Sequence, residues 1–228
     1  MPRFDRFEKI IGIEKLNALK KKTVLILGCG GVGGHIAEAL ARSNIGTLIL
    51  VDFDFIDETN INRQIIALSS TIGRRKVDVL EERIKDINSQ CNVFKIVEFI
   101  DESNIAELFE TQIDFFVDAC DTIRTKKEAI KLCLAKKIKF ISSMGTGNKL
   151  DPSKLEIIDI RKTNNDPLAR IMRKFVKDEK IKGKITVLTS TEIPIKTGDR
   201  TPGSTAFVPA VAGLMIAGYV VNTFLREE

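Results

Sequence analysis

Short runs of apolar residues alternate with longer amphipathic stretches through the first two thirds of the chain. Five runs rich in Val, Ile, Leu and Phe are predicted as strands of a mostly parallel sheet: residues 23–27, 47–51, 93–97, 113–117 and 138–142. Four stretches place apolar residues three and four positions apart, as helices packed on a sheet do: residues 32–42, 73–87, 103–109 and 125–135. This alternation predicts an α/β fold, with a Rossmann-like and mostly parallel sheet flanked by helices.

The pattern changes after Gly147. Residues 155–160 and 185–188 are predicted as later strands, with a basic helix between them and an apolar helix after Pro209. A chain of 228 residues can bury one good core. We therefore predict a single domain, 1–228, in which residues 1–147 form the Rossmann-like part. Residues 148–228 then form a C-terminal strand and helix elaboration that faces the substrate.

The last apolar stretch, residues 207–225, is long enough to cross a membrane. It also contains Pro209, Gly213, Gly218 and Asn222. Helices that are apolar on all sides also occur in large cores, and a doubly wound fold buries its closing helix against the sheet. We therefore interpret this stretch as a core helix and expect no association with a membrane.

Four cysteines, Cys29, Cys91, Cys120 and Cys133, are scattered without a Cys-x-x-Cys pair. This spacing indicates neither a disulfide framework nor a four-thiolate site, so we expect no zinc. Residues 1–9 alternate charged and apolar positions, and they lack the apolar core of a secretory signal. These features predict a cytoplasmic protein.

The formal charge of +5 is unevenly distributed. Residues 161–184 hold nine Lys or Arg against three Asp or Glu, which gives this segment +6 and leaves −1 for the rest of the chain. The helix predicted inside it has an apolar stripe at helical spacing: Leu168, Ile171, Met172, Phe175 and Val176. A second stripe is positive: Arg170, Arg173, Lys174 and Lys177. Such a face can hold a phosphate backbone, because neutralised phosphates release counterions; a solvated helix face is the alternative.

A glycine-rich loop joins the first predicted strand to the helix that follows. Its glycines are Gly28, Gly30, Gly31 and Gly33. In this context the first glycine permits a tight turn, the second lets the backbone approach phosphates, and the last lets helix and strand pack closely. Asp52 ends the second strand and can accept hydrogen bonds from ribose hydroxyls. These features fit NAD and ATP equally well.

The residues that follow Asp52 separate the two nucleotides. They comprise acids, amides and cations at fixed spacing: Asp54, Asn60, Arg63, Gln64, Lys76, Asp118 and Asp121. With these residues the chain resembles the ThiF, MoeB and HesA superfamily of adenylating enzymes, which are related to ubiquitin-activating enzymes. The resemblance implies that the chain binds ATP and Mg²⁺ and adenylates a carboxylate.

The resemblance also implies a role for each residue. Asp52 binds ribose, Asn60 and Arg63 contact the triphosphate and the developing charge, Lys76 neutralises phosphates, and Asp121 holds magnesium. The remaining nucleotide-binding residues are Gly28, Gly30, Gly31, Gly33, Asp54 and Gln64. Cations suit this chemistry, because adenylation brings a carboxylate against a phosphate. Considered singly, Lys76 also fits a solvated lysine and Asp121 an N-cap.

Residues 3–6 resemble the family segment that donates an arginine to the active site of a partner subunit. A homodimer is therefore implied. Arg6 is favoured over Arg3 as the catalytic donor, and a solvated arginine is the alternative.

Further motifs resemble one branch of the superfamily, the tRNA threonylcarbamoyladenosine dehydratases. They lie at residues 62–65, 67–68, 83–84, 87–88, 162–163, 166–169 and 190–192. This branch implies that ATP activates the threonine carboxylate of threonylcarbamoyladenosine in tRNA, and that ring closure then expels AMP. The positive stripe of the basic helix is predicted to contact the tRNA.

Two other functions stay open at this stage. One is adenylation of the C-terminal glycine of a ubiquitin-like sulfur carrier, with a sulfur-transfer or ubiquitin-like protein as partner. The other is an NAD-dependent binding module or oxidoreductase, for which 228 residues leave little room beyond the nucleotide fold. Cys29 and Cys120 flank the nucleotide loop, where small apolar packing is their expected role.

Overall fold

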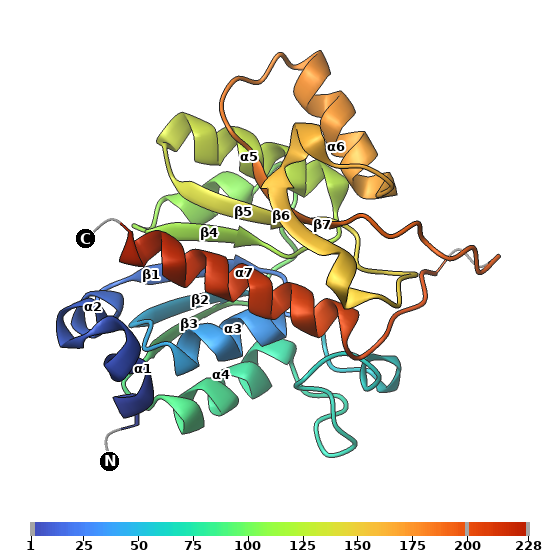
Figure 1. Cartoon of the computed structure of the whole chain (residues 1–228). Coiled ribbons are helices and arrows are strands. Elements are labelled where there is room, and N and C mark those ends of the chain that lie inside the picture. The colour runs from blue at the N-terminus through green and yellow to red at the C-terminus, as the bar shows by residue number, and fades with distance from the viewer. Residues whose placement is uncertain (1–2, 199–200, 227–228) are drawn as a thin grey trace.

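Seven strands form one sheet in the order β3-β2-β1-β4-β5-β7-β6 (Figure 1). The computed structural model describes residues 3–198 and 201–226, so residues 1 and 2 of the N-terminal segment lie outside the described residues. The strands are β1 (Thr23–Leu27), β2 (Thr47–Val51), β3 (Asn92–Ile96), β4 (Phe115–Asp118), β5 (Lys139–Ser143), β6 (Leu155–Asp159) and β7 (Thr186–Ser190). β6 runs antiparallel to β7, and the other pairs are parallel. The predicted fold class is confirmed.

Helices cover both faces of this sheet. Val24 and Ile26 of β1 share a core with α3 (Gly33–Arg42), α4 (Lys76–Ile87) and α7 (Val208–Leu225). Leu25 and Leu27 point to the other face and pack with α5 (Ile123–Lys136) and the 3-10 helix η2 (Ile105–Phe109). Because both faces are buried here, β1 and β2 are continuous apolar runs rather than alternating ones. The edge strand β3 is largely exposed.

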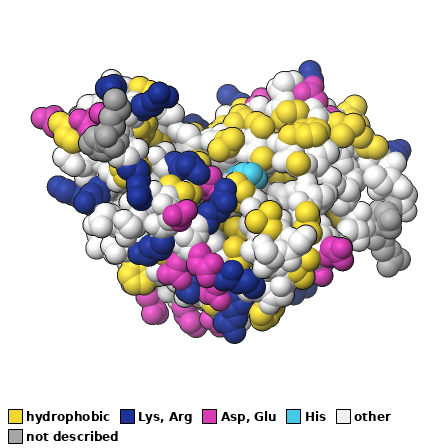
Figure 2. Space-filling model, turned by 90° about the horizontal axis from the view of Figure 1, so that it is seen from below, with side chains coloured by type: hydrophobic (Ala, Val, Ile, Leu, Met, Phe, Trp, Pro, Cys, Tyr) yellow, Lys and Arg dark blue, Asp and Glu magenta, His cyan; other side chains and the backbone are white. Residues whose placement is uncertain are grey.

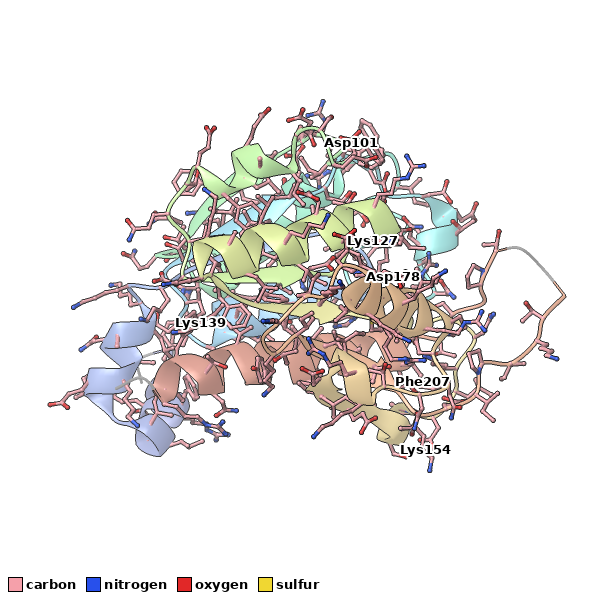
Figure 3. The ribbon with its side chains drawn as sticks, turned by 90° about the horizontal axis from the view of Figure 1, so that it is seen from above. Asp101, Lys127, Lys139, Lys154, Asp178 and Phe207 are labelled. Atoms are coloured by element: carbon pink, nitrogen blue, oxygen red, sulfur yellow. The ribbon has the colours of Figure 1, made fainter. Side chains whose placement is uncertain are left out.

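The basic helix α6 (Pro167–Asp178) packs beside α5 over the β7 end of the sheet (Figure 3). Its buried residues are Ala169, Met172, Phe175 and Val176. Ile171 is 39% exposed and Leu168 is only partly buried, so the predicted apolar stripe is wrong at Ile171 and should include Ala169. The ammonium of Lys127, from α5, lies 5.5 Å from the centre of the Phe175 ring.

The helix boundaries differ from the predictions where polar side chains or glycine intervene. The helix predicted at 103–109 is a 3-10 helix that begins at Ile105. Before it, the amide of Ser103 donates to the Asp101 carboxylate at 2.7 Å, a turn that competes with a regular helix. α4 begins at Lys76 rather than at residue 73, because Gly73 has a φ of +80° and Arg75 is extended.

Two short helices at the N-terminus, α1 (Asp5–Ile11) and α2 (Ile13–Leu19), were not predicted. Only Leu16 and Leu19 of these helices are buried. A seven-residue helix with at most two core positions has too little apolar periodicity to be recognised.

The closing helix α7 lies in the core, as predicted. By length and mean hydropathy it is a candidate membrane span, but half of it is buried inside the protein. Gly213 allows α7 to approach α3, since a side chain there would lie 2.6 Å from the carbonyl oxygen of Val32. Figure 2 shows the molecule from below, with hydrophobic side chains and the single histidine, His35, beside charges of both signs.

Candidate active site

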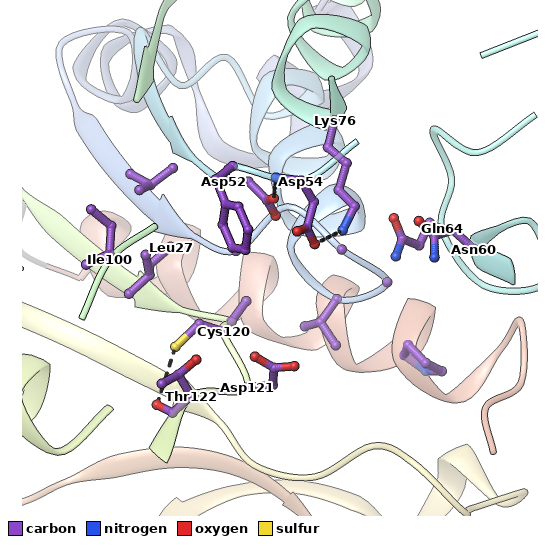
Figure 4. Close-up of a pocket in the computed structure, with 18 of the residues that line it drawn as sticks. Leu27, Asp52, Asp54, Asn60, Gln64, Lys76, Ile100, Cys120, Asp121 and Thr122 are labelled. Carbon is purple, nitrogen blue, oxygen red and sulfur yellow. Dashed lines mark hydrogen bonds and ion pairs between the residues drawn. The ribbon is translucent and has the colours of Figure 1, made fainter. Parts of the chain in front are cut away.

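A cavity of about 510 Å³ opens at the carboxyl ends of the central strands. Its wall is built by the segments that follow β1, β2, β3 and β4. The strand order reverses between β1 and β4, which is where open α/β sheets bind their ligands. Figure 4 shows Asp121 across this cavity from Asp52, Asp54 and Lys76.

The glycine loop forms the floor between β1 and α3. Gly28, Gly30 and Gly31 line the cavity. Gly28 has a φ of +91°, which favours glycine. Gly33 lies outside the lining, and a side chain there would approach the carbonyl oxygen of Gly28 to 1.8 Å. α3 therefore begins close behind the loop, where its N-terminal amides add positive potential.

Asp52 is held in a fixed orientation at the end of β2. Its carboxylate accepts hydrogen bonds from the amides of Cys29 at 2.7 Å and Asp54 at 2.9 Å. Burial raises the pKa of Asp52, although the charge of Lys76 and these two bonds oppose the shift. The side chain is thus held in place by two amides, and its remaining lone pairs can accept from a ligand.

Lys76 is not a solvated lysine. It is the first residue of α4, is 6% exposed, and its ammonium lies 2.6 Å from the carboxylate of Asp54. Both residues line the cavity. Their ion pair keeps a cation inside the site, where a polyphosphate would compete with Asp54 for it.

The segment after β2 presents Asn60, Arg63 and Gln64 to the cavity. Arg63 donates to the carbonyl of Thr59 and to the side chain of Asn62, both at 2.8 Å. Gln64 is 7% exposed, and its Oε1 is one of two buried side-chain atoms without a hydrogen-bond partner among the described residues. A buried acceptor in a cavity wall indicates a ligand or water as its partner.

The Asn60 side chain stabilises the start of this segment. Its Oδ1 accepts from the amide of Asp57 at 3.2 Å and completes a capping box for the 3-10 helix η1 (Glu58–Asn60). Asn60 therefore has a structural contact of its own, in addition to lining the cavity.

Asp121 lies in the loop after β4, on the opposite wall. Its carboxylate is exposed and has no hydrogen bond or ion pair within residues 3–198 and 201–226. The N-cap of α5 is Thr122 and makes no side-chain capping bond, so Asp121 is not the cap that it alternatively fitted. This carboxylate is free to bind a cation.

Asp118, the first acid of the same motif, has a different environment. It is buried and accepts from the ammonium of Lys126 at 3.0 Å and from the hydroxyl of Ser142 at 2.5 Å. It also accepts from the amide of Cys120 at 3.2 Å. Asp118 therefore fixes the loop that presents Asp121.

Comparison with known proteins assigns this site to a family. The model of the ThiF family matches residues 5–228. The chain belongs to the ThiF family. It is 43% identical to the tRNA threonylcarbamoyladenosine dehydratase of Bacillus subtilis, covering 99% of this chain and 95% of that protein. The Haemophilus influenzae dehydratase is 36% identical, covering 98% of this chain and 92% of that protein.

A solved structure shares the whole architecture of this ThiF chain. The crystal structure of the Escherichia coli dehydratase in complex with ATP superposes with a TM-score of 0.93 at 32% identity. The match covers 99% of this chain and 94% of that chain. The entire fold around the cavity is therefore common to both proteins.

The cysteines of this ThiF chain are not activated. Cys29 is buried and Cys120 partly buried, and burial raises the pKa of both thiols well above the ordinary value. The negative charges of Asp52 and Asp118, respectively, raise them further. Neither sulfur is a thiolate at neutral pH, so neither is a ready nucleophile.

The predicted residues outside the cavity fall into two groups. Arg170, Lys174 and Lys177 are exposed on α6, whereas Arg173 is partly buried and donates to the carbonyl of Thr163 at 2.8 Å. Arg173 is therefore partly engaged in binding the segment before α6.

Arg6 lies on α1, at the amino ends of the strands and away from the cavity (Figure 1). It has no hydrogen bond or ion pair among the described residues. Arg3, in contrast, donates to the carbonyl of Ile87 at the end of α4 at 2.7 Å.

Several cavity residues were missed from the sequence: Phe53, Glu98, Phe99, Ile100, Thr122, Thr146, Ser204 and Pro209. Glu98 to Ile100 lie just beyond the carboxyl end of β3, so the rule that ligands bind at carboxyl ends of strands would have found them. Ser204 and Pro209 come from the connection to α7 and carry no comparable signal.

Proposed function

We propose that this chain is an ATP-dependent tRNA threonylcarbamoyladenosine dehydratase. The observation that carries the proposal is one cavity that contains the predicted cations and acids, in a chain that matches dehydratases over nearly its whole length. Its substrates would be ATP and tRNA that carries threonylcarbamoyladenosine.

The cavity residues bind and orient the nucleotide. Gly30 and Gly31 offer backbone amides to phosphates, and the fixed carboxylate of Asp52 accepts from ribose hydroxyls. Lys76 exchanges Asp54 for a phosphate oxygen. Arg63, held by its bonds to Thr59 and Asn62, faces the negative charge that develops during adenylation.

The chemistry proceeds in two steps. A threonine carboxylate oxygen attacks the α-phosphorus of ATP, and the bond to pyrophosphate breaks. A nucleophile within the same modified nucleoside then attacks the activated carbonyl carbon and expels AMP, so the nucleoside loses one water in total. The protein needs no covalent nucleophile, which agrees with the raised thiol pKa values of Cys29 and Cys120.

A magnesium ion fits this site. Mg²⁺ is usually bound by one or two carboxylates together with substrate phosphates, and Asp121 supplies an unpaired carboxylate in the cavity wall. When bound, the ion would offset the charge of the phosphates.

The tRNA would lie along the positive face of α6. Arg170, Lys174 and Lys177 are exposed there, and the segment around them carries the excess positive charge of the chain. The partly engaged Arg173 would contribute its remaining donors. Contacts of this kind position a nucleic acid without reading its sequence.

A homodimer would complete the active site. Arg6 lies at the amino ends of the strands, whereas the cavity of the same subunit lies at their carboxyl ends. Arg6 would therefore reach only the cavity of a second subunit. Arg3 already donates a hydrogen bond to the carbonyl of Ile87, which favours Arg6 as the arginine that enters the partner's active site. The enzyme would act in the cytoplasm, where tRNA is modified.

Mass spectrometry of tRNA nucleosides from cells that lack the gene tests this function. We expect threonylcarbamoyladenosine to accumulate and its cyclic form to disappear. Reintroducing the wild-type gene should restore the cyclic form. Unchanged tRNA nucleosides, together with pyrophosphate exchange that depends on a ubiquitin-like carrier, would instead support the sulfur-carrier function.

A further inference from the structure

A buried ion pair joins the loop after β5 to the start of the basic helix. The ammonium of Lys149 lies 2.8 Å from the carboxylate of Asp166. The two side chains are 1% and 0% exposed. Lys149 also donates to the carbonyl of Gly145 at 2.5 Å. Neither charge lines the cavity, and the proposed chemistry uses neither of them.

Asp166 holds α6 by its other oxygen. As the N-cap of α6, it accepts from the amide of Ala169 at 2.8 Å. One carboxylate therefore fixes the first turn of the basic helix and binds Lys149 at the same time. Gly145 packs against this carboxylate so closely that a side chain there would lie 3.1 Å from it.

The other end of the same loop reaches the cavity. Thr146 lines it, next to Gly145 in sequence. Asn148 accepts from the amide of Ile195 at 2.8 Å through its backbone and from the amide of Gly203 at 2.6 Å through its side chain. Ser204, which follows Gly203, also lines the cavity. Residues 145–149 thus connect the cavity wall to the N-terminus of α6.

A buried ion pair contributes little net stability to a fold. Desolvation of two charges often exceeds their attraction, and apolar replacements of such pairs are often equally stable or more stable. What a pair of this kind supplies is a defined geometry, because each partner has few alternatives in the interior. Its location between the cavity and the RNA-facing helix suggests what that geometry is for.

We propose that Lys149 and Asp166 are positioning residues that fix α6 relative to the ATP cavity. This inference rests on the proposed function. Phosphates bound along α6 would set where the modified nucleoside lies, and the pair would set where α6 lies. A small rotation of α6 would leave RNA binding intact but would move the threonine carboxylate away from the α-phosphate.

The test is the double substitution Lys149→Met and Asp166→Asn in the full chain. Removing both charges avoids leaving one unpaired in the interior, and asparagine retains the oxygen that caps α6. The matched control is the double substitution Lys154→Met and Asp151→Asn. Asp151 likewise caps a helix, the 3-10 helix η3 (Pro152–Lys154), but neither residue belongs to the buried ion pair. The readouts are kcat and KM for modified tRNA, KM for ATP, and tRNA affinity at several salt concentrations.

We expect kcat with tRNA to fall roughly 10- to 100-fold, because a misplacement of about 1 Å has this effect on reaction rates. The KM for ATP, the tRNA affinity and its salt dependence should stay within about twofold of the wild type, and the control should equal the wild type. A double variant with wild-type kcat would overturn the proposal. A fall in kcat that is accompanied by an equal loss of tRNA affinity would also overturn it. The substitutions would then have weakened RNA binding by α6, rather than changed the orientation of α6 relative to the cavity. Absence of tRNA-dependent activity in the wild type would refute the proposed function instead.

Discussion

At the scale of single residues, the Asp121 carboxylate lies in the cavity wall without a hydrogen bond or ion pair to any described residue. We predict that Asp121→Asn lowers AMP formation by at least about a hundredfold, because a neutral amide is a weaker magnesium ligand. The fold should persist, since Asp121 makes no capping bond to α5. AMP release and the melting temperature measure the two effects. Asp178→Asn, an exposed acid at the end of α6, is the control. Magnesium-dependent activity near that of the wild type would remove Asp121 from the site.

Arg63 differs from Lys76 in being held by neutral oxygens rather than by an acid. We predict that Arg63→Ala lowers kcat roughly 10²- to 10³-fold and changes the KM for ATP far less, since a cation aimed at developing charge acts mainly in the transition state. Steady-state kinetics with modified tRNA measures both constants. Arg74→Ala is the control, because Arg74 pairs with Glu82 outside the cavity. If only the KM for ATP changes, Arg63 is a ground-state ligand.

The sequence predicted which residue types meet in the cavity, but not how they are paired. Asp54 and Lys76 are 22 positions apart, and their ion pair depends on the bridge between Phe55 and Arg75 that brings α4 back to the strand end. The unpartnered oxygen of Gln64 and the partial engagement of Arg173 by Thr163 are likewise products of local packing. Spacing in a sequence carries no signal for such contacts.

At the scale of elements, α6 packs one face against the protein and exposes positive side chains on the other. We predict that Lys174→Gln with Lys177→Gln reduces the slope of log tRNA affinity against log salt by roughly one to two units, at about 0.7 to 0.9 per lost phosphate contact. Both lysines are exposed and do not form a salt bridge among the described residues. Lys9→Gln with Lys20→Gln, on the opposite edge of the sheet, should leave the slope unchanged. An unchanged slope in the α6 variant would mean that this face is only solvated.

Helices α3 and α4 are joined by Glu38, which binds Arg42 and Arg83. Burial alone would raise the pKa of Glu38, but the bonds and charges of these arginines outweigh it, so the pKa lies below the ordinary value of 4.5. The lowered pKa means that Glu38 stabilises the protein above pH 4.5 and that this stabilisation is lost as the pH falls through the lowered pKa.

We therefore predict that Glu38→Gln reduces the free energy of unfolding at pH 7 by about 1 kcal/mol or less, and that the difference shrinks towards zero in acid. Melting temperatures across pH measure this effect. Glu82→Gln, which removes a more exposed partner of Arg74, should have a smaller effect. A difference that does not depend on pH would show that the charge of Glu38 is not responsible.

The elements that were predicted and those that were missed differ in their periodicity. The strands β1 to β5 contain apolar runs and were located within about two residues. The segment 103–109 has helical periodicity, but the turn at Asp101 limits it to a 3-10 helix. α1 and α2 bury only two side chains between them, so tertiary contacts rather than pattern define them.

At the scale of the whole molecule, residues far apart in sequence meet because the sheet reverses its order between β1 and β4. This reversal places the glycine loop, Asp52 and Asp121 around one cavity. The C-terminal segment adds β7 and β6 to the same sheet, and α6 packs against β7, so the proposed RNA-binding face and the cavity belong to the same fold. We therefore predict one reaction that uses both.

The most direct test incubates the purified protein with ATP, magnesium and tRNA that carries threonylcarbamoyladenosine, and then measures the nucleoside mass and the AMP released. We predict a nucleoside lighter by one water, AMP in equal amount, and neither product with tRNA that lacks the modification. AMP formed only with a ubiquitin-like carrier, or a nucleoside of unchanged mass, would contradict this prediction.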